Sequence, residues 1–121
     1  MQLSLVGDRL LIDLEWYEQL WAFTLTKTFS IPLEHVQGVS TEEPLSTWAE
    51  IRAPGTFLPG VIKAGTYYTN RGREFWYVTA DKNYLTLELQ DEPYRRIVLT
   101  VEQSADWTER LRQALSRKES D

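Results

Sequence analysis

The sequence predicts a mainly β domain that ends in one amphipathic α-helix, and three observations carry this prediction. Apolar and polar residues alternate in several short stretches within the first 101 positions, which is the period of a half-buried strand. Glycine, proline and Asn/Asp clusters separate the later alternating stretches about every 11 residues. After residue 103 the apolar period becomes that of a helix.

The length and composition are those of one folded domain. The 121 residues are 42% apolar and 26% charged, and a chain of this length buries roughly two thirds of its unfolded surface. We therefore expect a single domain over 1–118, followed by a short frayed tail at 119–121. The sequence has no cysteine, which removes thiolate metal sites and cysteine nucleophiles.

Charge and hydropathy restrict the partners. The net charge of −5 disfavours nucleic acid, because nucleic-acid-binding domains present basic surfaces. The N-terminal residues show neither the basic start nor the apolar stretch of a signal peptide, and no run approaches the roughly 20 apolar residues of a membrane span. We expect a soluble cytoplasmic protein with no transmembrane segment; peripheral contact with a membrane stays open.

The first 31 residues predict two strands, a short helical segment and a third strand. Leucine and isoleucine alternate around Gly7-Asp8, which is typical of a two-residue hairpin turn. Over 16–23 the apolar residues recur at i, i+4 and i+7, which suits a short helix or an irregular excursion. The alternation then returns over 23–31 and predicts a strand in which Phe23 and Leu25 share the apolar face.

The middle of the chain predicts turns and loops around one short strand. Residues 33–39 suit one turn followed by a strand, and 40–50 is a polar stretch that predicts an exposed loop. Two prolines and two glycines within 52–60 predict turns rather than a regular element.

The next stretch predicts a meander of four short strands. Alternating segments at 61–68, 75–78, 85–89 and 97–101 are separated by turn residues. In a meander each strand pairs with the next one along the chain.

The last element is a helix with one apolar stripe. Ser104 suits the N-cap position, where its hydroxyl accepts a bond from the first turn. Trp107, Leu111 and Leu115 recur at i, i+4 and i+8 and share one face. A single stripe predicts that one face docks over an open end of the sheet.

Two stretches resemble bacterial pleckstrin-homology-like (PH-like) families. Residues 31–39 are similar to an I-P-L-x-x-V/I-x-x-V step. Residues 52–66 are similar to the R-A-P-G-T-x-x-P-G-x-x-x-x-G-T stretch of a family of unknown function. The resemblance implies a PH-like barrel of about seven antiparallel strands in two orthogonal sheets, capped by the C-terminal helix. It implies little about function, because this fold hosts lipid, peptide and protein binding.

We find no motif for catalysis, a metal or a cofactor. The glycine spacing from Gly55 to Gly60 matches a phosphate loop, but the required Lys-Ser/Thr is replaced by Val61-Ile62. His35 is the only histidine, and we interpret it as structural. The expected function is therefore non-enzymatic binding or scaffolding.

Two groups of residues are candidates for binding. The first is aromatic and would bind an unknown protein partner or a second copy of the chain, because exposed aromatics are enriched at interfaces: Trp16, Tyr17, Trp21 and Trp48. The second, an alternative, is basic. Residues 51–82 carry five bases against two acids, and Lys63, Arg71 and Arg73 would bind a small anion or a lipid head group at a hairpin rim. The loop Gly7-Asp8-Arg9 lacks the basic pattern by which eukaryotic PH domains bind phosphoinositides.

Overall fold

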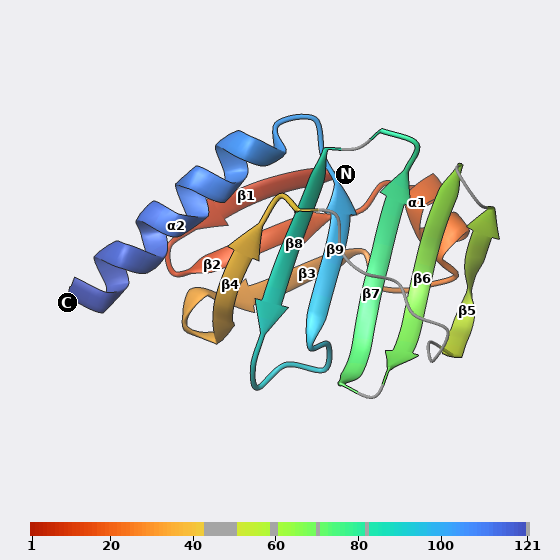
Figure 1. Cartoon of the computed structure of the whole chain (residues 1–121), viewed down its shortest axis with the longest axis horizontal. Helices are drawn as coiled ribbons and strands as arrows, with labels where there is room; N and C mark the ends of the chain where they lie inside the picture. Colours follow the sequence, from red (N-terminus) through yellow and green to blue (C-terminus); the bar gives the residue numbers. More distant parts are fainter. Residues whose placement is uncertain (43–50, 59–60, 70, 82, 121) are drawn as a thin grey trace.

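The structure is a computed structural model that describes residues 1–42, 51–58, 61–69, 71–81 and 83–120, arranged in two β-sheets and two α-helices (Figure 1). The smaller sheet has the strand order β1 (Gln2–Val6), β2 (Arg9–Asp13), β3 (Thr28–Pro32). The larger sheet has the order β4 (Val36–Ser40), β8 (Tyr84–Leu89), β9 (Arg96–Thr100), β7 (Gly72–Thr79), β6 (Ile62–Thr69), β5 (Ile51–Leu58). The helices are α1 (Trp16–Ala22) and α2 (Ser104–Ser120), and a 3₁₀ turn, η1 (Leu33–His35), precedes β4.

The core lies between the two sheets. Figure 1 shows the smaller sheet behind the larger one, with its strands running across those in front. Each sheet contributes the alternate residues of its strands, as expected when one face of a strand is buried. The fully buried core side chains include Leu10, Ile12 and Ile31 from the smaller sheet and Phe75, Leu85, Leu87, Ile97 and Leu99 from the larger.

Helix α2 covers the β4 end of this core, as the sequence predicted. Leu111 and Ala114 are buried in the core, and Trp107 and Leu115 pack against it. The Arg112 guanidinium donates to the carbonyl of Val39 at 3.1 Å and ties the helix to β4. The helix begins at Ser104 and its backbone continues to Ser120, two residues beyond 118. Neither helix of the described residues is long and apolar enough to cross a membrane.

The predicted meander is wrong, because β9 lies between β7 and β8. It pairs in parallel with β7, from Glu74 with Arg96 to Tyr77 with Leu99, and antiparallel with β8. Local alternation shows which side chains face the core, but it does not show which strands are neighbours. The described strands number nine rather than about seven, and they form two open sheets with no closed barrel among them.

The predicted turn region at 52–60 contains a strand. Ile51–Leu58 forms β5, and its pairing with β6 shifts register between Arg52 and Gly55. Pro54 falls within this irregularity, and β5 is the outermost strand of its sheet. Proline is tolerated in both situations because no ladder hydrogen bond is lost. Gly55 pairs with Gly65, whose φ of 138° is a conformation that favours glycine.

The predicted strand at 23–31 begins only at Thr28. Phe23 adopts the left-handed conformation, with φ 51° and ψ 43°, and ends α1. Phe29 and Ile31 face the core as predicted, whereas Phe23 and Leu25 are exposed. The hairpin at Gly7, the helix at 16–22 and the turn leading into β4 confirm the predictions for those segments. Residues 43–50 of the predicted loop lie outside the described residues.

Candidate functional site

Helix α1 exposes its apolar residues and buries its acidic one. Its buried residues are Glu18 and Ala22, which share one stripe at i, i+4. Its two apolar stripes point outward, together with the apolar residues of the segment that follows. We call this group the α1 surface; it consists of Trp16, Tyr17, Leu20, Trp21, Phe23 and Leu25, which are 44–100% exposed.

Three contacts fix α1 in this orientation. One Glu18 carboxylate oxygen accepts the Glu15 backbone N–H at 2.7 Å and closes a capping box. The same oxygen lies 2.7 Å from the N-terminal ammonium of Met1, in an almost fully buried ion pair. On the other side, the hydroxyl of Thr56 in β5 donates to the carbonyl of Trp21 at 2.8 Å. These contacts hold the acidic stripe inward, and the apolar stripes are consequently left outside.

Tyr77 of β7 is itself buried in the core and lies near the charge of Glu18. Burial, with smaller contributions from Glu18 and Tyr17, raises the pKa of Tyr77 from 10.0 to about 12. The phenol therefore stays neutral well into alkaline pH.

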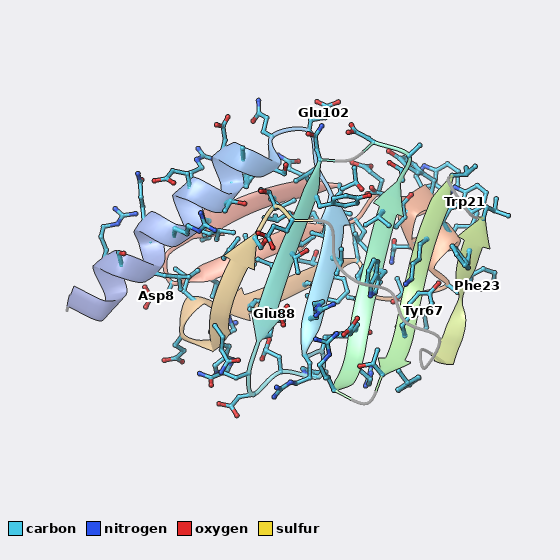
Figure 2. The ribbon with its side chains drawn as sticks, viewed as in Figure 1. Asp8, Trp21, Phe23, Tyr67, Glu88 and Glu102 are labelled. Atoms are coloured by element: carbon cyan, nitrogen blue, oxygen red, sulfur yellow. The ribbon has the colours of Figure 1, made fainter. Side chains whose placement is uncertain are left out.

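The α1 surface lies at the β5 end of the molecule. Figure 2 shows Trp21 and Phe23 there. Because Thr56 bonds to α1, the side chain of Leu58, two residues further along β5, points to the same face of the sheet about 7 Å away. Leu58 is also exposed and extends the apolar area beyond the helix.

The aromatic candidates are partly brought together. The rings of Trp16 and Tyr17 meet edge to face at 5.8 Å, and Trp21 is one turn further along the same helix. All three are exposed. Trp48 lies outside the described residues.

The basic candidates are not brought together. In the β6–β7 hairpin Lys63 pairs with Val78, whereas Arg73 pairs with Tyr68 near the turn. Five residue steps along a strand separate the two rows by roughly 17 Å. Lys63 is buried, and its ammonium lies 3.7 Å from the centre of the Trp76 ring. The structure therefore contains no shared rim of Lys63, Arg71 and Arg73.

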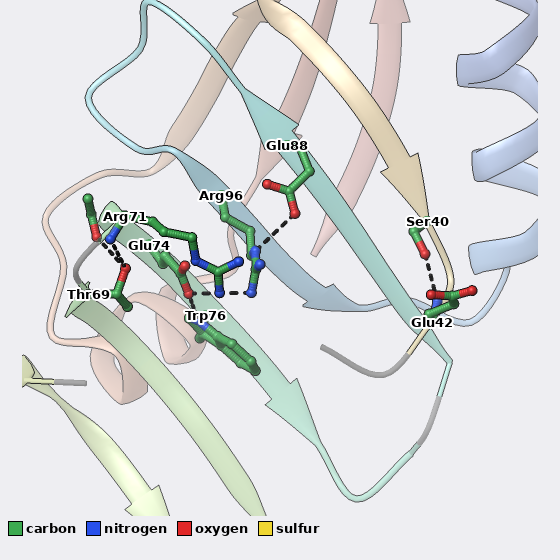
Figure 3. Close-up of polar contacts among 9 residues, drawn as sticks. Ser40, Glu42, Thr69, Arg71, Glu74, Trp76, Glu88 and Arg96 are labelled. Carbon is green, nitrogen blue, oxygen red and sulfur yellow. Dashed lines mark hydrogen bonds and ion pairs between the residues drawn. The ribbon is translucent and has the colours of Figure 1, made fainter. Parts of the chain in front are cut away.

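The outer face of the larger sheet carries a cluster of charges that the sequence analysis did not identify. Glu74 accepts the indole N–H of Trp76 at 3.0 Å and lies 3.8 Å from the Arg96 guanidinium, as Figure 3 shows. Arg96 also donates to Glu88 at 3.0 Å. These residues belong to three adjacent strands, so the cluster depends on the strand order. The only local signal was a charged residue at an alternate position in each strand.

His35 has a structural contact. Its Nδ1 lies 3.1 Å from a carboxylate oxygen of Glu92, which ties η1 to the turn between β8 and β9. No group of three or more possible metal-ligating side chains occurs in the described part of the chain.

Comparison with models of protein families, with curated proteins and with solved structures gives no match for this chain. Its function must therefore be argued from its own residues. The most unusual of these features is the α1 surface, where large apolar side chains are held in solvent by an inward-facing carboxylate.

Proposed function

We propose that this chain is a non-enzymatic binding domain that associates with a second copy of itself through the α1 surface. The observation that carries the proposal is the orientation of α1. A helix on a folded domain ordinarily buries its apolar stripe, and this one buries Glu18 and Ala22 instead. Contiguous exposed apolar residues mark interaction surfaces.

The size of the α1 surface suits a protein interface. A fully exposed aromatic side chain offers about 150–250 Å². With exposures of 44–73%, the four aromatics of the α1 surface together offer roughly 350–550 Å². Leu20, Leu25 and Leu58 add to this area. One side of a standard protein interface buries about 800 Å², so the surface provides most of what a dimer needs.

The chemistry of the surface favours a second copy as the occupant. In a two-fold dimer the same patch meets itself, so a charged patch would face its own charge. The six side chains of the α1 surface carry no charge, and their aromatic rings can pack edge to face or offset against identical rings. These six side chains therefore bring no like charges of their own into the contact.

The non-enzymatic part of the proposal is supported by how the buried carboxylates are engaged. Glu18 accepts a backbone N–H and pairs with an ammonium. Glu74 accepts an indole N–H beside a guanidinium. Both serve the fold, which leaves neither poised for acid–base chemistry.

We retain PH-like ancestry within the proposal. Its support is the similarity of the two sequence stretches and the position of α2 over one end of the core. The parallel pairing of β7 with β9 departs from the antiparallel meander that the resemblance implies, so the proposal is limited to common ancestry of the two stretches and the capping helix.

Sedimentation velocity tests the self-association. The wild-type chain should shift from monomer toward dimer between about 10 and 300 µM, a range that covers a weak apolar interface. The double variant Trp16→Ser/Leu20→Ser should remain monomeric with an unchanged melting temperature, because both side chains are already solvated in the monomer. Val6→Ser is the matched control, since Val6 is also exposed but lies on β1.

Two outcomes would reject the proposed association. One is a wild-type chain that stays monomeric over the whole concentration range. The other is a dimer that the double variant and the control weaken equally.

A further inference from the structure

Strand β3 is an edge strand with free backbone groups. Among the described strands its only neighbour in the sheet is β2. The Leu14 N–H donates to the Lys27 carbonyl, and the Leu33 N–H donates to the Asp8 carbonyl. These two bonds fix which residues of β3 direct their backbone groups toward β2. Because bonding alternates along an antiparallel strand, Phe29 and Ile31 bond to β2.

The alternate residues of β3 therefore point their backbone groups away from the sheet. The N–H and C=O of Thr28 and Ser30 have no backbone partner among the described residues. Both side chains are exposed as well. Exposed edges of this kind can pair with another strand.

A groove runs along this edge. Its volume is about 230 Å³, and it lies between β3 and the turn that joins β8 to β9. Its floor and walls are mostly apolar, and the lining side chains include Phe29, Ile31, Leu89, Pro93, Tyr94 and Ile97. The rings of Phe29 and Tyr94 lie 5.8 Å apart, edge to face, so aromatic surface lines the groove.

The size and charge of the groove indicate what it would accept. Pockets for small organic ligands are usually larger, about 300–1,000 Å³, whereas this volume suits one or two amino-acid side chains. Glu92 is the one charged residue that lines the groove in the described structure. Glu92 also contacts His35 at 3.1 Å. Its carboxylate makes the groove complementary to an apolar side chain with a basic side chain two residues away, on the same face of the strand.

We propose that β3 accepts an extended peptide segment of a partner protein as a fourth strand of the smaller sheet. The backbone of the segment bonds to Thr28 and Ser30. One of its apolar side chains enters the groove beside Phe29 and Tyr94, and a lysine or arginine lies against Glu92. Addition of a strand to a sheet edge derives affinity from the backbone and specificity from alternate side chains.

This site is separate from the self-association proposed above, because it uses none of the α1 surface residues. The two proposals can therefore fail independently. A chain that dimerises and binds no peptide would remove only this one.

The experiment uses a capped seven-residue peptide of alternating threonine and valine, with one valine replaced by lysine, so that the lysine and the remaining valines share the face that meets the groove. Titrated into the ¹⁵N-labelled chain, it should shift the amide signals of Thr28, Ser30 and Tyr94 and slow the exchange of the first two amides. Shifts confined to another sheet edge or to α1 would overturn the proposal. Protection of Thr28 and Ser30 without peptide, rising with protein concentration, would also overturn it, because two β3 edges would then be paired.

Two variants sharpen the test. Ser30→Pro removes the outward N–H while sparing the bonds to β2, and should weaken binding about fivefold or more, the effect of one lost hydrogen bond. Ser30→Ala is its control, because it loses the same hydroxyl contact with Arg9 but keeps the N–H. Glu92→Lys should weaken the lysine peptide and favour a glutamate peptide. If all three variants bound the lysine peptide as tightly as the wild-type chain, the proposal would be refuted.

Discussion

Arg96→Met should be among the most destabilising single changes on the outer face of the larger sheet. Arg96 is 8% exposed and Glu74 is 2% exposed. The substitution keeps much of the apolar stem of the side chain and removes the guanidinium. Glu74 then keeps the indole N–H of Trp76 but loses the positive charge 3.8 Å away.

The expected magnitude follows from the burial of the two partners. Removing one member of a buried pair costs about 3–5 kcal/mol, because the other charge stays in a low dielectric. We expect the lower value, about 3 kcal/mol, because 3.8 Å is a long contact. At about 4 °C per kcal/mol for a domain of this size, the melting temperature falls by about 12 °C.

The second ion pair of Arg96 provides the comparison. The side chain of Glu88 is 48% exposed, so Glu88→Gln should cost at most about 1 kcal/mol. Urea denaturation of Arg96→Met, Glu74→Gln, Glu88→Gln and the double variant Arg96→Met/Glu74→Gln gives the coupling energy between Arg96 and Glu74. The double variant removes both charges of this pair and should be more stable than Arg96→Met alone. Equal small losses for Arg96→Met and Glu88→Gln would refute the reasoning.

Three further predictions concern the core and one turn. Below pH 10 the phenol of Tyr77 is neutral in both the folded and the unfolded chain and costs the fold nothing. Because folding raises the pKa of Tyr77 to about 12, the free energy of unfolding falls as the pH rises from 10 to 12. Tyr77→Phe should reduce this loss by up to about 2 kcal/mol, measured by urea denaturation at successive alkaline pH values. Gly72→Ala should cost about 1–3 kcal/mol in thermal melts, since φ there is +124° and a Cβ would meet an arginine Cγ at 2.6 Å, whereas Gly38→Ala should be nearly neutral. Leu111→Ala should cost about 2–5 kcal/mol in the same melts and Leu115→Ala less, because only Leu111 is fully buried; equal losses would contradict the docking of α2.

The sequence predicted elements better than their arrangement. Periods of two and of 3.6 residues are local, so the strands near 62–69, 72–79, 84–89 and 96–100 and helix α2 could be located. The parallel pairing of β7 with β9 depends on contacts between residues about 22 positions apart. One local sign was present: Ile97, Val98 and Leu99 form a continuous apolar run, which is typical of a central strand buried on both faces.

The local sequence also could not predict which face of helix α1 is buried. The pattern at 16–23 predicted a short helix and marked its aromatics as candidates, but two faces of that helix could have been buried. The decisive contacts come from elsewhere in the chain, namely Met1 on Glu18 and Thr56 on Trp21. For the same reason, the distance between Lys63 and Arg73 in the folded chain could not be predicted before the strand pairing was known.

The orientation of α1 has an energetic consequence for its function. Burying a Leu, Phe or Met side chain is worth about 1.5–3 kcal/mol, so exposing Leu20 and Phe23 in the monomer forgoes several kcal/mol. Burying Glu18 adds a desolvation penalty that its partners must offset. A domain that only had to fold would gain by turning the helix over. The dimer proposed above would recover this free energy where the α1 surfaces meet. For this reason the exposed aromatic side of the helix is a better candidate for binding than the charged face of the larger sheet.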